Sequence, residues 1–360
     1  MTRRWRLLWA LPLAGVLGVA GLLLWARAPR DATGREGLRD FPGPGVPPAR
    51  PGLRVLTFNI AYGRGPLDDA GDLRSRAEVE EHLAAIARTI QHSAADIALL
   101  QEVDLDAART HHLDQVAFLA RATGLRHTAT AVTWSKRYVP YPFWPPSQHY
   151  GPMLSGQAVL SRYPLRHHEV WPLPQPSANP WWYNEFYLTR VAQRVQVALG
   201  AAPTDAAPAS PARESWATVV NLHLEAFDRD NREVQAGLVA EALARLDPGG
   251  LLLVGGDFNT VPPEAPSRKA FADEPDTDMD GDLTLPRLRA ARASLQDAFT
   301  PTQAADSGSF TFPATAPNRQ LDHLLYASTR YRLESATVLH PAPAPSDHLP
   351  ILVTFGRVGE

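Results

Sequence analysis

Short apolar runs alternate with amphipathic stretches along most of the chain. Residues 53–58 and 96–100 are apolar runs of strand length, and we expect both to form buried strands. Between them, residues 78–90 repeat apolar side chains three or four positions apart, which predicts a helix with one apolar face. A helix over residues 114–123 and a strand over residues 125–133 are expected to follow.

The second half of the chain repeats this order of elements. Its pattern predicts a strand over residues 216–222, a helix over 229–246 and a strand over 251–254. In each half the second strand ends close to a carboxylate, Glu102 in the first half and Asp257 in the second. Ligands of α/β sheets gather beyond the carboxyl ends of such strands, so we expect a site where these two ends meet.

The N-terminus carries the longest apolar run. Three arginines precede an uncharged stretch over residues 7–26, close to the roughly 20 residues that a helix needs to cross a bilayer. This pattern predicts an uncleaved membrane anchor over residues 1–28, in a single-pass membrane protein whose catalytic domain lies on the extracytoplasmic side. The alternatives are a buried core helix and a signal peptide cleaved at Ala26-Arg27-Ala28, where Pro29 disfavours cleavage.

Residues 29–51 are rich in proline, glycine and charge, and we expect a stiff linker ahead of a catalytic domain over residues 52–357. Within that domain, residues 201–213 favour a flexible loop between two strands. Residues 134–152 and 180–187 are dense in aromatic residues and proline. We interpret them either as packed irregular loops or as a rim that covers a substrate or touches a membrane.

The composition excludes several kinds of chemistry. The 360 residues include no cysteine, which excludes disulfides, thiolate zinc sites and a cysteine nucleophile. The formal net charge of −3 provides no strong positive field for holding nucleic acid without sequence preference, although a local basic face stays open.

Six scattered segments carry polar residues at or beside the predicted strand ends. They are Phe58-Asn59, Gln101-Glu102, Asn221-Leu222-His223, Gly255-Gly256-Asp257-Phe258-Asn259, Gln320-Leu321-Asp322 and Ser346-Asp347-His348. Carboxylate and amide oxygens suit Mg²⁺, whereas a zinc site would call for thiolates or paired histidines. A hard cation, a histidine and a carboxylate together suit the attack of water on phosphorus.

These motifs resemble the endonuclease/exonuclease/phosphatase superfamily, which includes deoxyribonuclease I-like nucleases, neutral sphingomyelinases and inositol polyphosphate 5-phosphatases. The similarity extends over residues 53–354 and is most specific in residues 56–60, 99–103, 256–259 and 346–351. The resemblance implies an α/β fold, a four-layer α/β/β/α sandwich of two packed mixed sheets. With the predicted N-terminal transmembrane helix, this fold would make up the whole chain.

The resemblance also implies a metal site. Glu102 would be the principal ligand of a divalent ion, Mg²⁺ or alternatively Mn²⁺. Asn59 would bind metal or phosphate through its amide, and Asp347 would support the metal site.

The remaining site residues would act on the phosphate and on water. Asp257 would align or deprotonate the attacking water, and Asn259 would hold that water and a phosphoryl oxygen. His348 would contact the scissile phosphate and be oriented by Asp322, whereas His223 would bind phosphate or assist the leaving group.

The sequence thus predicts a membrane-anchored, divalent-metal-dependent phosphoesterase, a hydrolase acting on a phosphodiester or phosphomonoester through metal-assisted attack of water. The expected substrate is a phosphate ester of lipid type, with nucleic acid and inositol phosphate as alternatives. No obligate protein partner is implied. A catalytically silent binding module is disfavoured because every residue that the chemistry needs is present.

Overall fold

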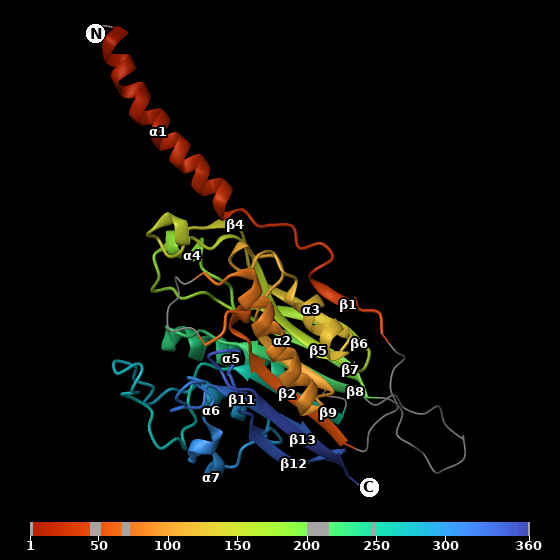
Figure 1. Cartoon of the computed structure of the whole chain (residues 1–360). Helices are drawn as coiled ribbons and strands as arrows, with labels where there is room; N and C mark the ends of the chain where they lie inside the picture. The colour runs from red at the N-terminus through yellow and green to blue at the C-terminus, as the bar shows by residue number, and fades with distance from the viewer. Residues whose placement is uncertain (1–2, 44–51, 67–72, 200–215, 247–249, 359–360) are drawn as a thin grey trace.

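The computed structural model describes residues 3–43, 52–66, 73–199, 216–246 and 250–358 (Figure 1). Within these residues, the strands form two mixed sheets that pack face to face, which confirms the expected α/β sandwich. The first sheet has the order β1 (Gly37–Asp40), β4 (His127–Val139), β5 (Gly151–Ser161), β3 (Ile97–Asp104), β2 (Gly52–Asn59), β13 (Ile351–Arg357) and β12 (Tyr331–Val338). The second has the order β10 (Gln296–Asp297), β11 (Asp322–Ser328), β9 (Gly250–Asp257), β8 (Trp216–His223), β7 (Val191–Ala198) and β6 (Leu165–Pro172).

Each half of the chain contributes a strand, a helix and a parallel strand at the centre of one sheet. In the first half, α2 (Arg76–Ser93) connects the parallel strands β2 and β3. In the second half, α5 (Arg229–Arg245) connects the parallel strands β8 and β9. Carboxyl ends of parallel neighbours meet at one edge, so the two predicted strand ends lie on the same side of the sandwich.

Helices cover the outer face of each sheet. Helices α2 and α3 (Gln115–Thr123) pack on the first sheet, and α5 and α6 (Thr284–Ala290) pack on the second. This arrangement explains why consecutive residues of β3 are apolar. Leu99 faces the core between the sheets, and Leu100 faces the core under α2. A strand buried on both faces is apolar throughout rather than alternating, as observed here.

A network of buried amides joins the two sheets just below the strand ends. Gln101 of β3 donates from Nε2 to Oδ1 of Asn221 on β8 at 2.6 Å. Asn221 in turn donates to the carbonyl oxygens of Leu100 and Ala158, and its own carbonyl accepts from Gln157 at 2.7 Å. These contacts fix the ends of β3 and β8 relative to each other.

The remaining helices, α1 (Arg3–Arg27), α4 (Trp181–Asn184) and α7 (Pro301–Ala304), lie outside this framework. Figure 1 shows α1 projecting from the domain, with α4 near its carboxyl end. The side chains of α1 are described from Leu13 onward, and the first part of the expected anchor lies outside them.

In the described part of the chain, no helix combines the length and the apolar character needed to cross a membrane. This finding corrects the prediction of a transmembrane helix, and with it the prediction of a single-pass membrane protein with an extracytoplasmic catalytic domain.

Part of the expected linker belongs to the sandwich. Strand β1 pairs antiparallel with β4, and the side chains of Arg30 and Arg35 bind Asp106. The expected loop over residues 201–213 lies outside the described residues.

Candidate active site

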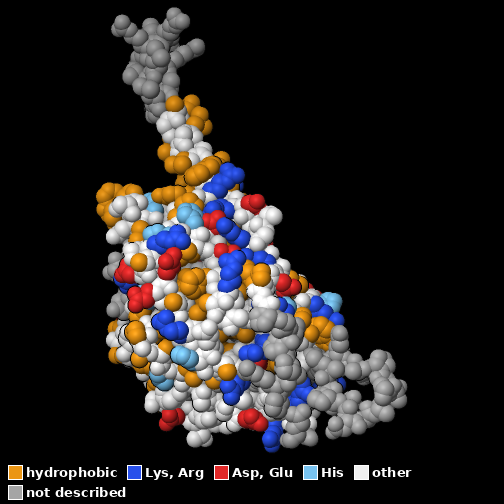
Figure 2. Space-filling view, turned by 45° about the vertical axis from the view of Figure 1, so that its right-hand side comes forward, with side chains coloured by type: hydrophobic (Ala, Val, Ile, Leu, Met, Phe, Trp, Pro, Cys, Tyr) orange, Lys and Arg blue, Asp and Glu red, His pale blue; other side chains and the backbone are white. Residues whose placement is uncertain are grey.

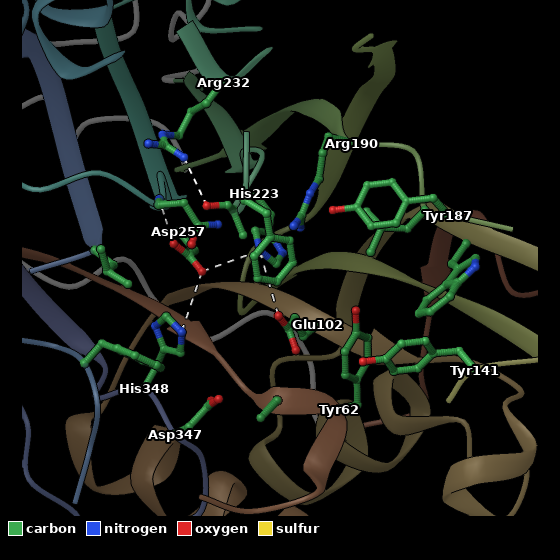
Figure 3. Close-up of a pocket in the computed structure, with 18 of the residues that line it drawn as sticks. Tyr62, Glu102, Tyr141, Tyr187, Arg190, His223, Arg232, Asp257, Asp347 and His348 are labelled. Carbon is green, nitrogen blue, oxygen red and sulfur yellow. Dashed lines mark hydrogen bonds and ion pairs between the residues drawn. The ribbon is translucent and has the colours of Figure 1, made fainter. Parts of the chain in front are cut away.

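The predicted site residues converge beyond the carboxyl ends of the central strands (Figure 3). Asn59, His223 and Asp257 are the last residues of β2, β8 and β9. Asp322 is the first residue of β11 and pairs in register with Asp257, because these two strands are antiparallel. His348 lies in the loop between β12 and β13, beside the same edge.

Glu102 reaches the site through an irregularity of its own strand. The pairing of β3 with β5 shifts register between Leu100 and Val103, and Glu102 between them has a φ of 56°. Such a bulge redirects a side chain out of the alternating pattern of the sheet. As a result the Glu102 carboxylate turns towards the cavity instead of entering a core.

Asn59 holds two of the carboxylates together. Its Nδ2 donates to Oε1 of Glu102 at 3.2 Å and to Oδ2 of Asp257 at 3.0 Å. Its own side-chain oxygen accepts the backbone N–H of Ala61 at 3.1 Å. The amide therefore supports the acidic side chains through its NH₂ group.

Asp257 and Asn259 are locked by short local bonds. The backbone N–H of Asn259 donates to Oδ1 of Asp257 at 2.9 Å, which leaves Oδ2 facing the site. Asn259 itself has a φ of 51°, and its Nδ2 donates to the carbonyl oxygen of Leu224 at 2.9 Å. Both side chains line the cavity.

His348 and Asp322 form a buried hydrogen-bonded pair. The His348 Nδ1–H donates to Oδ2 of Asp322 at 2.8 Å, and Nε2 lies 3.7 Å from Oδ2 of Asp257. Burial opposes the charged imidazole, but the nearby Asp322 and Asp257 carboxylates outweigh it and raise the pKa of His348 to about 10. His348 is therefore a cation at neutral pH.

His223 is neutral by contrast. Burial and the nearby Arg190 guanidinium hold the pKa of His223 well below its usual range. Its Nε2 lies 3.8 Å from Oε1 of Glu102 and 3.5 Å from Oδ2 of Asp257, distances longer than those of a normal hydrogen bond.

Three carboxylates line the site. Burial raises the pKa of Glu102, and it raises the pKa of Asp257 and of Asp347 to about 6 each. Their oxygens gather in one cavity, and oxygen donors of this kind suit a divalent ion.

The hydrogen bonds and ion pairs of the acidic side chains indicate where such an ion would bind. Asp257, Asp322 and His348 offer ligand atoms within 4.8 Å of one another. However, His348 Nδ1 and Asp322 Oδ2 already bind each other in a hydrogen bond. The oxygens of Glu102 and Asp347 fit a hard cation better, because within the described residues neither carboxylate forms an ion pair with Lys or Arg.

Arg190 is a site residue that the sequence pattern did not reveal. It is 5% exposed, directly precedes β7 and lines the cavity beside His223 and Glu102 (Figure 3). Its Nε has no hydrogen-bond partner among the described residues and lies 3.9 Å from Oε2 of Glu225. The available signal was an arginine directly before β7, a strand of mixed apolar and polar residues.

The cavity that contains these groups has a volume of about 880 Å³. Glu102, Asp257 and His348 lie together in it, and aromatic residues of the two predicted aromatic segments form one of its sides. His323, which follows Asp322 on β11, is a histidine outside the predicted motifs. It is buried, stacks on Phe258 and contacts the carbonyl oxygen of Thr260 at 2.8 Å.

Comparison of this chain with known proteins identifies one family by sequence and a set of solved structures with a similar fold. A model described as the Endonuclease/Exonuclease/phosphatase family matches residues 56–348, more than half of the chain. A search of the curated proteins finds no match.

Solved structures with similar folds are distant in sequence. An endonuclease/exonuclease/phosphatase from Beutenbergia cavernae superposes with a TM-score of 0.57 at 22% identity, covering 86% of this chain and 72% of that one. The human nocturnin catalytic domain, solved with a bound sulfate anion, gives 0.53 at 19% identity and coverages of 92% and 100%. A mannosyl-6-phosphatase from Bacteroides thetaiotaomicron gives 0.50 at 16% identity and coverages of 84% and 99%.

The matched residues begin in β2 and end at His348, so they enclose every side chain of the site. With that match and the shared sandwich, the chain belongs to the Endonuclease/Exonuclease/phosphatase family and is a hydrolase of phosphate ester bonds.

Proposed function

We propose that this chain is a divalent-metal-dependent phosphoesterase that hydrolyses a phosphodiester or phosphomonoester by attack of water. One observation carries the proposal. A group of carboxylates, Glu102, Asp257 and Asp347, faces the cations His348 and Arg190 across a single cavity. This arrangement suits a ligand that brings both a metal ion and a phosphate.

Glu102 and Asp347 would hold the ion, with Asn59 keeping Glu102 in place through its amide. Oxygen donors of this kind suit Mg²⁺, and Mn²⁺ is the alternative. When bound, the ion would neutralise the phosphoryl oxygens and stabilise the leaving oxygen.

The chain's own residues would position the phosphate and the water. His348, fixed by Asp322, directs its Nε2–H towards the same region as Oδ2 of Asp257, so it would bind a phosphoryl oxygen there. Arg190 would bind a second phosphoryl oxygen with its guanidinium, which is suited to paired contacts with such oxygens.

Asp257 would accept a proton from the attacking water through Oδ2, since Oδ1 is held by the backbone of Asn259. Asn259 would orient that water with its side-chain oxygen, because its NH₂ group is bound to Leu224. His223 is a neutral imidazole within reach of the same point, and it would assist the leaving group.

The charges support a small ester more than nucleic acid. On the face drawn in Figure 2, Lys and Arg side chains are interspersed with Asp and Glu. Inside the cavity, Arg232 is paired with Asp282 and Arg319 with Asp273. A polyanion gains affinity by neutralising many phosphates, which these paired cations do not offer.

The test is an assay of the whole chain with bis(p-nitrophenyl) phosphate, p-nitrophenyl phosphate and plasmid DNA, each with Mg²⁺ or with EDTA. We expect turnover of at least one p-nitrophenyl ester with Mg²⁺ and its loss in EDTA. Asp257→Asn should lower kcat about 10²–10⁴-fold, the usual contribution of a positioned acid–base group.

Asp276→Asn is the matched control, because Asp276 lines the same cavity but is exposed and belongs to none of the strand ends. It should leave turnover of the small esters unchanged. Turnover that is equal in EDTA and Mg²⁺, or equal in Asp257→Asn and wild type, would overturn the proposal. A preference for plasmid DNA over both esters would identify a nuclease instead.

A further inference from the structure

Aromatic residues form a continuous row along one side of the cavity. We call Tyr141, Phe143, Tyr150, Trp182, Tyr183 and Tyr187 the aromatic wall, since all six line the cavity. Neighbouring rings in the wall lie 5.4–6.4 Å apart between centroids. The wall joins two segments that are distant in sequence, one between β4 and β5 and one around α4.

The two ends of the wall, Tyr150 and Tyr187, are more buried than its middle. Tyr150 is buried and packs edge-on against Trp134, whereas Phe143 is 55% exposed and Trp182 49% exposed. Apolar rings that line a concave, open surface are typical of a site for an apolar ligand group.

The wall is connected to the phosphate-binding end of the cavity. Tyr187 donates its hydroxyl hydrogen to Oε1 of Glu225 at 2.8 Å, and Oε2 of the same carboxylate lies 3.9 Å from Arg190. Figure 3 shows Tyr187 and Tyr141 on the side of the cavity next to Arg190 and Glu102. A phosphate held by Arg190 would therefore place its attached group beside the rings.

The charges around the cavity restrict what that attached group can be. The rim includes Glu274, Asp276 and Asp278, which are exposed carboxylates. Arg109, which lies below the wall, is paired with Asp104 and stacked over Tyr62 at 3.6 Å. An additional anionic group would meet the rim carboxylates, whereas an uncharged apolar group would meet the rings.

We propose that the aromatic wall is a subsite for an uncharged apolar group, an aryl ring or an alkyl chain, attached to the phosphate that the enzyme hydrolyses. This inference rests on the proposed phosphoesterase function and narrows its substrate class. The wall acts by removing the apolar group from water, so it discriminates among esters that have the same charge and the same leaving group.

The experiment uses three diesters that share p-nitrophenol as leaving group: methyl, phenyl and octyl p-nitrophenyl phosphate. We expect kcat/KM for the phenyl or the octyl ester to exceed that for the methyl ester at least tenfold, as apolar pockets commonly provide. A preference for phenyl assigns the subsite to rings, and a preference for octyl assigns it to chains. Trp182→Ala should lower this ratio towards one.

Matched controls come from the neighbouring residues. Trp181 and Trp144 are 76% and 80% exposed, adjoin the wall in sequence and do not line the cavity. Trp181→Ala and Trp144→Ala should keep the wild-type ratio, whereas Trp182→Ala and Phe143→Ala should reduce it. Equal losses for all three esters in the wall variants would mean a structural role only and would overturn the subsite.

Binding separates a failure of this inference from a failure of the proposed function. Calorimetric titration of the whole chain with methyl-, phenyl- and octylphosphonate in Mg²⁺ should show tighter binding of an apolar phosphonate, lost in Trp182→Ala. If no ester is hydrolysed but this preference is found, the proposed function fails and the subsite stands. Equal binding of the three phosphonates, or a dimer that Trp182→Ala dissociates, would overturn the subsite.

Discussion

At the scale of single residues, the site combines features that oppose folding. Glu102 has a left-handed backbone conformation, which costs about 1–3 kcal/mol for a residue other than glycine. Burial also raises the pKa values of Glu102, Asp257 and Asp347, so each charged carboxylate is less favourable in the folded chain than in water. Such a site should be stabilised by its own cation.

Glu102→Gln tests this balance. In EDTA the free energy of unfolding of the variant should exceed that of wild type by about 1 kcal/mol, because one buried carboxylate is removed. Its Tm should be higher by roughly 2–4 °C. Mg²⁺ at a hundredfold excess over its Kd should increase the free energy of unfolding of wild type by about 2.7 kcal/mol and so raise its Tm. The same Mg²⁺ should leave the Tm of the variant nearly unchanged. Differential scanning calorimetry measures both effects.

Glu80→Gln is the control, since Glu80 belongs to an exposed pair with Arg76 on α2. It should show the same Mg²⁺ shift as wild type. An Mg²⁺ shift that survives in Glu102→Gln would remove Glu102 from the metal site.

At the scale of elements, the close approach of β8 and β9 positions Asp257. Gly256 precedes Asp257 at a φ of 141°, and a Cβ added there would lie 1.9 Å from the carbonyl oxygen of Leu222. Only glycine fits this contact, because the clash is with backbone that is hydrogen-bonded in the sheet. The parallel pair therefore depends on the glycine directly before Asp257.

Gly256→Ala should destabilise the chain by about 3 kcal/mol or more in urea unfolding and lower turnover together with it. Gly237→Ala offers a matched change within α5, where the nearest atom to an added Cβ is 3.7 Å away. That substitution should stabilise the chain by about 0.5–1 kcal/mol. Equal stability of the two variants would contradict the proposed packing at Gly256.

At the scale of the whole molecule, the two sheets are joined beneath the site by amides rather than by apolar contacts alone. Asn221 uses its side chain to bond Gln101 and two backbone carbonyls of the opposite sheet. Since Glu102 follows Gln101 directly, this network also sets where the Glu102 carboxylate lies.

Asn221→Leu and Gln101→Leu should each destabilise the chain by about 1–3 kcal/mol, because each leaves buried polar groups without partners. The double variant should cost less than the sum of the two, with a coupling of about 0.5–3 kcal/mol. Urea unfolding of the four proteins gives this coupling directly. Strictly additive losses would show that the two amides act independently.

The sequence predicted those features that depend on local pattern. The periodicity of residues 78–90 corresponds to α2, and the ends of β3 and β9 carry Glu102 and Asp257 as expected. Partners brought by distant segments could not be predicted in this way. Arg190, directly before β7, meets Glu225, two residues after the end of the neighbouring strand β8, and no local spacing links the two.

His323 and the N-terminal segments show the same limit. A histidine in a short apolar stretch gives no sign that Phe258 and Thr260 will enclose it. Arg30 and Arg35, expected in a linker, instead reach Asp106 on the sandwich, and Gly37–Asp40 becomes an edge strand. The predicted anchor relied on apolar length alone, and the described residues contain no helix that meets the requirement.

The site residues are divided between two halves of the chain with the same order of elements, so a chain break between the halves has a predictable effect. A break between Leu199 and Trp216 would separate Asn59, Glu102 and Arg190 from Asp257 and His348. Neither fragment would then contain all of these site residues, and each would expose part of a sheet face that the other normally covers. Activity would therefore require both pieces, and the break would cut both sheets, since β12 and β13 complete the first sheet and β6 and β7 complete the second.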